Sequence, residues 1–186
     1  MARSAKMDAV TLLKTDHRKV EGLFESFEKA RAADRKEKLV KQICTELTIH
    51  TMIEEEIFYP ACTGEIEDET VDEAYVEHDG AKVLISELLQ SDSSNEFYDA
   101  KVKVLSEMIK HHVKEEEQRS EGMFVQAKKA GLDMDGLGER MMQRKKELME
   151  EFEEGDNLPT PETRSYTGHE LQQGKLIEME AADAAD

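Results

Sequence analysis

Four histidines of this 186-residue chain stand on the apolar stripes of four predicted helices, and two of them are followed four residues later by a glutamate on the same stripe. On a helix, residues i and i+4 share a face with Cβ atoms about 5–6 Å apart, so His-x-x-x-Glu directs an imidazole and a carboxylate to one point. Imidazoles and carboxylates bind metal ions, and a carboxylate can bridge two ions about 3.5–4 Å apart. The pattern therefore predicts a buried dinuclear metal site. Its six expected ligands are His17, His50, Glu54, His78, His112 and Glu116.

A single His-x-x-x-Glu sequence is weak evidence, because glutamate is abundant and His17 with Glu21 and His111 with Glu115 match as well. Most such pairs are surface contacts worth about 0.2–0.5 kcal/mol, and a lone histidine on an apolar stripe can be a hydrogen-bonded core residue. The coincidence across four stripes favours the metal. Burying the carboxylate of Glu54 or Glu116 without a partner would destabilise the fold by roughly several kcal/mol. A bound cation removes that cost.

Apolar periodicity predicts the helices that must position these residues. The fourth stripe begins at Tyr98 and reaches Glu116, and its helix can continue to Ala130, where Gly131 can end it. The other expected bounds are a first helix from Asp8, as N-cap, to about 31–33, a second from its cap Asp34 to Pro60 and Gly64, a third from about 68–70, a loop at 91–95, and a fifth helix at about 138–152.

The segment 49–56 is similar to the segment 111–117, so the second and fourth helices are expected to be pseudo-equivalent. Short loops make neighbouring helices antiparallel. The expected fold is all-α, an up-down-up-down antiparallel four-helix bundle with an additional C-terminal helix. Residues 1–155 form the predicted domain, and 156–186 form an acidic tail that is mobile or loosely docked.

The net charge of −18 makes nucleic acid and anionic membranes poor partners. No stretch approaches the roughly 20 apolar residues of a membrane span, and the first residues show no secretory signal, so a cytoplasmic protein is expected. Cys44 and Cys62 have neither C-x-x-C nor zinc spacing and are expected to be idle thiols.

Other catalytic motifs are absent from the sequence. It contains no Glu-x-x-His of the ferritin type, no H-E-x-x-H, no glycine-rich phosphate loop and no G-x-S-x-G. Polar residues outside the six ligands are expected to be solvated or, for His111, close to a ligand. They are Glu55, Glu56, His111, Glu115, Glu117 (a spare ligand candidate) and His169.

The residues around the six ligands resemble those of hemerythrin-like proteins of the HHE cation-binding type, over about residues 10–130. The matching motifs are Asp16-His17 with Leu23-Phe24, His50-x-x-x-Glu54-Glu55 with Phe58-Tyr59-Pro60, Glu77-His78, and His112-Val113-Lys114-Glu115-Glu116-Glu117. The resemblance implies two non-haem iron ions, oxo- or hydroxo-bridged, in a four-helix bundle. Glu54 and Glu116 would bridge them, and the four histidines would complete the ligand set.

The chain departs from oxygen-carrying hemerythrins, which have His-x-x-x-His in the third helix. Here Ala74 and Lys82 stand four residues before and after His78, so one metal lacks an imidazole and is open to water, peroxide or NO. The hydroxyl of Tyr75 could reach this position. The expected role is to bind or sense O2 or to handle reactive oxygen or nitrogen species. The alternatives are peroxidase- or catalase-like turnover, or a passive metal-binding bundle.

Overall fold

A computed structural model describes residues 7–155, 158, 163 and 165 of the chain, and in this part all regular structure is helical. The expected all-α class is therefore confirmed. The elements are α1 (Ala9–Lys29), α2 (Ala33–Ile53), η1 (Glu54–Phe58), α3 (Tyr59–Cys62), α4 (Asp68–Leu89), α5 (Tyr98–Glu117), α6 (Met123–Lys129) and α7 (Met134–Gly155).

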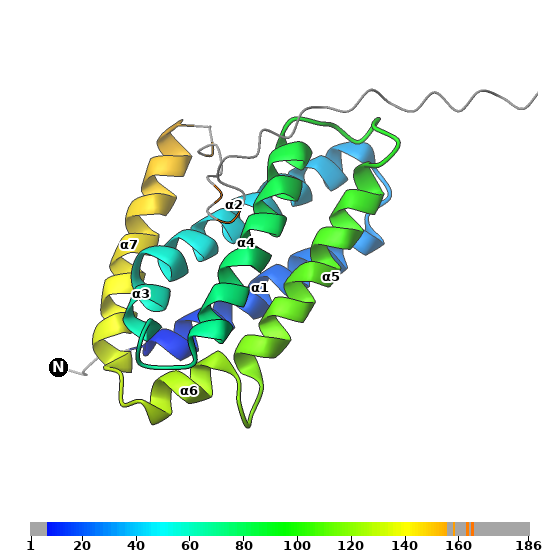
Figure 1. The fold of residues 1–186 in the computed structure, drawn as a ribbon. Helices are drawn as coiled ribbons and strands as arrows, with labels where there is room; N and C mark the ends of the chain where they lie inside the picture. The colour runs from blue at the N-terminus through cyan, green and yellow to red at the C-terminus, as the bar shows by residue number, and fades with distance from the viewer. Residues whose placement is uncertain (1–6, 156–157, 159–162, 164, 166–186) are drawn as a thin grey trace, which may run out of the picture.

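Four long helices, α1, α2, α4 and α5, form the bundle, and each runs opposite to the one before it (Figure 1). Around the bundle, α1 contacts α2, α2 contacts α4, α4 contacts α5, and α5 returns to α1. The additional helix α7 packs against α1, α2 and η1 on the outside. This arrangement is the expected four-helix bundle with a further C-terminal helix.

The apolar core is divided into two clusters. One contains Leu13, Ile53 and Phe58 together with residues of α6 and α7. The other contains Val20 and Leu47 and fills the opposite end of the bundle. The predicted ligands occupy the turns between these clusters, so a polar layer lies between two apolar regions.

The helical run that begins with α2 ends at Cys62, between Pro60 and Gly64, where its stop is expected, but Pro60 itself lies inside it. Proline has no N–H to donate within a helix. The chain accommodates it with one π-helical turn, η1, in which the backbone N–H of Tyr59 bonds to the carbonyl of Glu54, five residues back. Each π turn holds one residue more than an α turn, so it rotates Tyr59 toward the face that carries Glu54. The helix then ends at Cys62, before Gly64, which has a φ of 76°.

Several expected bounds differ from the structure. Asp34 lies in the first turn of α2, whose cap is Ala32 without a side-chain hydrogen bond. The fourth helix does not continue to Ala130, because residues 118–122 form a non-helical connection between α5 and α6. The first helix ends at Lys29, before the expected 31–33, and the fifth spans Met134–Gly155, longer than the expected 138–152. The Asp8 cap is confirmed: its carboxylate accepts the Thr11 N–H at 2.7 Å.

Most of the predicted tail, 156–186, lies outside the described residues, as does His169. Of the described tail residues, Leu158 packs against the second apolar cluster, and the backbone N–H and hydroxyl of Ser165 donate to Asp79 at 2.6 Å. Among the described helices, none is long and apolar enough to cross a membrane.

The packing of α7 yields a test of whether this helix belongs to the domain. Leu148 is fully buried against the first cluster, so Leu148→Ala should lower the free energy of unfolding by about 2–5 kcal/mol. The matched control Met142→Ala, at a side chain 41% exposed on the same helix, should change it by less than about 0.5 kcal/mol. Equal effects in urea unfolding would show that α7 does not pack as described.

Candidate metal centre

The structure brings all six predicted ligands together in the layer between the apolar clusters. Each bundle helix contributes one histidine near this level, and the glutamates come from η1 and α5. All six are buried, and Glu54 is completely inaccessible to solvent. The side chains fall into two halves that share carboxylates.

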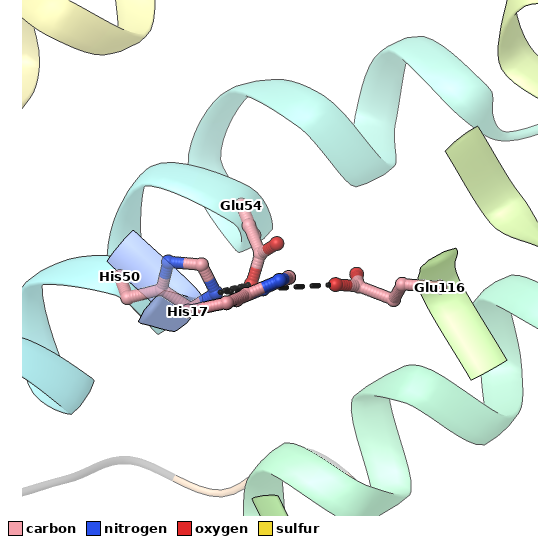
Figure 2. A group of neighbouring side chains, drawn as sticks. All are labelled: His17, His50, Glu54 and Glu116. Carbon is pink, nitrogen blue, oxygen red and sulfur yellow. Dashed lines mark hydrogen bonds and ion pairs between the residues drawn. The ribbon is translucent and has the colours of Figure 1, made fainter. Parts of the chain in front are cut away.

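The first half consists of His17, His50, Glu54 and Glu116 (Figure 2). The Nε2 atoms of His17 and His50 are 3.1 Å apart. Oε2 of Glu54 lies 3.2 Å from Nε2 of His50, and Oε2 of Glu116 lies 3.3 Å from Nε2 of His17. In Figure 2, Glu116 extends toward this group from the opposite side to the other three residues.

The second half consists of His78 and His112, whose Nε2 atoms are 3.2 Å apart, with Glu54. Oε2 of Glu54 is 3.4 Å from His78. Oε1 of Glu116 is 3.6 Å from His112, so the two oxygens of this carboxylate face the two halves. Both glutamates therefore stand where a bridging carboxylate would stand.

The hydroxyl of Tyr59 also reaches the second half. It lies 3.1 Å from Nε2 of His78 and donates to Oε1 of Glu116 at 3.2 Å. The sequence-based suggestion that Tyr75 would provide this hydroxyl is not what the structure shows: the Tyr75 ring packs edge-on against the ring of Tyr59, with centroids 5.2 Å apart. The π turn explains the difference, since it places Tyr59 on the face of Glu54.

Each imidazole faces a second carboxylate on its outer side. Nδ1 lies at hydrogen-bonding distance from this carboxylate in three histidines and at 3.6 Å in His50. An ionised carboxylate can only accept, so in those three histidines Nδ1 carries the proton and Nε2 presents its lone pair to the centre, whereas Nδ1 of His50 makes no hydrogen bond. The pairs are His17 with Glu117 (2.8 Å), His78 with Glu55 (3.1 Å), His112 with Glu77 (2.8 Å) and His50 with Asp16 (3.6 Å).

These pairs form a closed ring around the bundle. The carboxylate on α1 faces the histidine of α2, the one on η1 faces α4, the one on α4 faces α5, and the one on α5 faces α1. Each outer carboxylate is adjacent in sequence to a predicted ligand, as in Asp16-His17 or Glu54-Glu55. The expectation that Glu55 is solvated was wrong: its side chain is 10% exposed and is also paired with Lys82. Glu117 is the partner of His17 and not a seventh inward ligand.

Burial and like charge make the centre costly without a cation. Burial raises the pKa of Glu54 well above its ordinary range, and the negative charge of Glu116 adds to the rise. For Glu116 burial acts in the same direction, but the imidazoles of His112 and His17 outweigh it and hold its pKa below the ordinary value. Burial lowers the pKa of His78 to about 4, which favours the neutral ring that can coordinate a metal.

The donor set fits a metal pair. Both oxygens of Glu54 and Oε2 of Glu116 are buried without a hydrogen-bond partner. Neutral Nε2 atoms with facing lone pairs, 3.1 Å apart in one half and 3.2 Å in the other, repel unless a positive charge lies between them. Adjacent donors of a six-coordinate ion with bonds of about 2.1 Å are about 3 Å apart, close to these separations. The ligand role of the six residues stays a prediction that this geometry supports.

A cavity of about 200 Å³ leads to the second half from solvent. Its lining includes Ala74, His112 and Glu116. A much smaller space, of about 10 Å³, borders all four histidines. Small molecules therefore have room to approach the His78–His112 half. Neither cysteine is a reactive thiol, because burial raises the pKa of both Cys44 and Cys62 to about 12.

Comparisons with known proteins agree with this picture. The sequence profile of the hemerythrin HHE cation-binding domain matches residues 8–123. The crystal structure of a hemerythrin HHE cation-binding domain-containing protein from Mycobacterium kansasii has a TM-score of 0.66 at 21% identity, covering 81% of this chain and 94% of that one, which shows the shared fold. A protein named DNA nickase from Nostoc sp. (strain PCC 7120) is 30% identical over 112 residues, 60% of this chain; the chain spans only 32% of that protein.

The raised pKa of Glu54 predicts how metal-free protein responds to pH. The folded state binds this proton more tightly than the unfolded state, whose carboxyl has a pKa near 4.5, so folding loses stability as the pH rises from that value toward the folded one. The glutamine of Glu54→Gln cannot ionise, so at about pH 8 the free energy of unfolding of this variant should exceed that of wild type by about 1–3 kcal/mol. The difference should be smaller at about pH 5.

Urea unfolding of the metal-free proteins across this pH range measures the difference. The control Glu107→Gln changes an exposed carboxylate and should follow the wild-type curve. A Glu54→Gln curve parallel to wild type at all pH values would mean that Glu54 is not held in a desolvated environment.

Proposed function

The chain belongs to the hemerythrin HHE cation-binding family, and we propose that its buried centre holds two iron ions that bind small oxygen or nitrogen ligands. In this role the protein binds or senses O2 or handles reactive oxygen or nitrogen species. The family supports metal binding; the identity of the metal and the ligand are the proposal.

The observation that carries the proposal is the pair of glutamates in the apolar interior. Glu54 is fully buried with neither oxygen hydrogen-bonded, and Oε2 of Glu116 has no hydrogen bond either. Around them stand four imidazoles, and outer carboxylates hydrogen-bonded to Nδ1 direct Nε2 inward in three of them. Two divalent cations would neutralise the carboxylates and occupy the space between the facing nitrogens.

Iron suits a site that combines imidazole with bridging carboxylate and contains no thiolate. Two iron ions held this closely supply a redox-active pair at which O2, peroxide or NO can bind. The chain's own residues hold and orient the pair: Glu54 and Glu116 join the halves, the histidines complete each half, and the apolar clusters keep bulk water away.

The half formed by His78 and His112 is the position at which we place the external ligand. It lacks a third imidazole, since Ala74 stands one turn before His78, and the cavity of about 200 Å³ opens onto it. The Tyr59 hydroxyl lies within 3.2 Å of both His78 and Glu116. Burial and the neighbouring glutamates raise the pKa of Tyr59, so in the metal-free protein the phenol keeps its proton and can donate it in a hydrogen bond.

That hydroxyl favours peroxide turnover as the second candidate function. A phenol beside an open position could donate a hydrogen bond, or a proton, to a bound peroxide oxygen. One measurement, the steady-state loss of peroxide per iron, distinguishes a centre that only binds ligands from one that consumes peroxide.

The relative named DNA nickase does not lead us to propose DNA cleavage here. The matched part is about a third of that protein, and the net charge of −18 opposes association with a phosphate backbone. We propose instead a small-molecule ligand as the partner, with neither nucleic acid nor a membrane.

Removal of the bridging groups should remove the metal. We predict about two iron ions per chain in wild type and clear loss of bound iron in Glu54→Ala, Glu116→Ala and their double variant. The control Glu107→Ala, at an exposed position of α5, should retain the wild-type content. Iron analysis of purified, folded protein measures this, and full iron content in the double variant would refute the bridging assignment.

Removal of the hydroxyl should change the ligand chemistry but not the metal content. Tyr59→Phe is expected to keep about two irons and to alter the visible spectrum and azide affinity of the ferric protein, because the hydroxyl stands at the open half. If peroxide turnover occurs, its rate per iron should fall by about 10²–10⁴-fold when the phenol acts as a general acid. The matched control Tyr75→Phe removes the hydroxyl of the ring that packs against Tyr59. If Tyr75→Phe changed the visible spectrum and the azide affinity while Tyr59→Phe changed neither, the assignment to Tyr59 would be contradicted.

A further inference from the structure

The four outer carboxylates differ in how their charge is balanced. Asp16 is paired with Lys145, Glu55 with Lys82, and Glu117 with Arg18. Among the ion pairs of the described residues, the partners of Glu77 are imidazoles only: that of His112, which it orients, and that of His111. A lysine or arginine repels metal ions, whereas a neutral imidazole binds them.

Three side chains meet at this position on the outside of α4 and α5. Nε2 of His111 lies 3.4 Å from Oε1 of Glu77 and 3.1 Å from Oε1 of Glu115, and the three donors can all reach one ion. The side chains of His111 and Glu115 are 63% and 44% exposed, so solvent ions have access to them. One imidazole with two carboxylates is a donor set for a divalent cation.

The cavity that leads to the buried centre begins beside these residues. Its lining contains both Glu77 and Glu115, and it ends on His112 and Glu116, which are 3% and 2% exposed. Oε2 of Glu116 has no hydrogen-bond partner. Neither lysine nor arginine occurs in the lining, whose carboxylates are Glu67, Glu73, Glu77, Glu115, Glu116 and Glu121.

We propose that Glu77, His111 and Glu115 form an outer divalent-cation site that takes metal ions from solvent and delivers them through this acidic cavity to the buried centre. The proposal rests on the proposed function, since delivery requires a buried centre to receive the ions. Glu77 links the two sites, because Oε1 faces His111 while Oε2 accepts from Nδ1 of His112.

The physical effect is on the rate of loading. A cleft lined by one sign of charge concentrates counter-ions and raises association rates by about 10–10³-fold at low ionic strength, and salt weakens the effect. The outer site adds a position where an arriving ion exchanges water for protein ligands. It contributes no donor to the final pair, so its removal should slow loading and leave the final content unchanged.

Stopped-flow mixing of metal-free protein with Co²⁺, followed by the visible absorption of bound cobalt, tests this. His111→Ala/Glu115→Gln should load about 3–10-fold more slowly than wild type at low salt, with a weaker salt dependence, and reach the same final cobalt content. Glu77 is left intact because it orients His112. The control Glu107→Gln makes the same charge change as Glu115→Gln at another exposed position of α5 and should load like wild type. Equal loading by wild type and the double variant would overturn the proposal.

A second measurement detects the outer ion itself. Titration of iron-loaded protein with Mn²⁺, with free ion measured by electron paramagnetic resonance, should reveal one weak additional site per chain that His111→Ala removes. No additional site in wild type would overturn the proposal. If wild type holds no metal pair, the proposed function fails instead, and the same titration of the metal-free chain still decides whether the outer site binds an ion.

Discussion

Negative charge inside an apolar bundle is the constraint on which the rest of this structure depends. Glu54 and Glu116 lie between two hydrophobic clusters, and three of their four oxygens have no hydrogen-bond partner. Burying a carboxylate without a counter-charge destabilises the folded state by roughly several kcal/mol. The imidazoles reduce this cost only in part: His112 and His17 lower the pKa of Glu116, whereas burial and the charge of Glu116 keep the pKa of Glu54 raised. A metal pair would supply the missing counter-charge.

The ring of outer carboxylates makes the arrangement cooperative. At three of the four positions a carboxylate of one helix accepts a hydrogen bond from the histidine of the next, so the position of that imidazole depends on the packing of two helices. Residues outside the bundle take part as well, since Lys145 of α7 is paired with Asp16. The additional helix therefore helps to define the centre, although it provides none of the predicted ligands. An asymmetry remains at Glu77, which faces solvent and the acidic cavity.

The sequence was sufficient for the fold class and for the grouping of the six predicted ligands, because helical periodicity fixes which residues share a face. The sequence did not reveal the position of Tyr59. In a regular helix Phe58, four residues after Glu54, would share the face of Glu54, and only the π turn before Pro60 brings Tyr59 to that face instead. The outer carboxylates were also missed. Adjacent residues on a helix point about 100° apart, so Glu55 faces a neighbouring helix, and its partner can be known only once the order of helices around the bundle is known.

The most direct test of this account is X-ray diffraction from crystals of the iron-loaded protein, with an anomalous difference map recorded at the iron absorption edge. The account predicts two peaks about 3.5–4 Å apart, one beside His17 and His50 and the other beside His78 and His112, with Glu54 and Glu116 between them. No peak in this layer, or a single peak held by one half alone, would contradict the dinuclear centre.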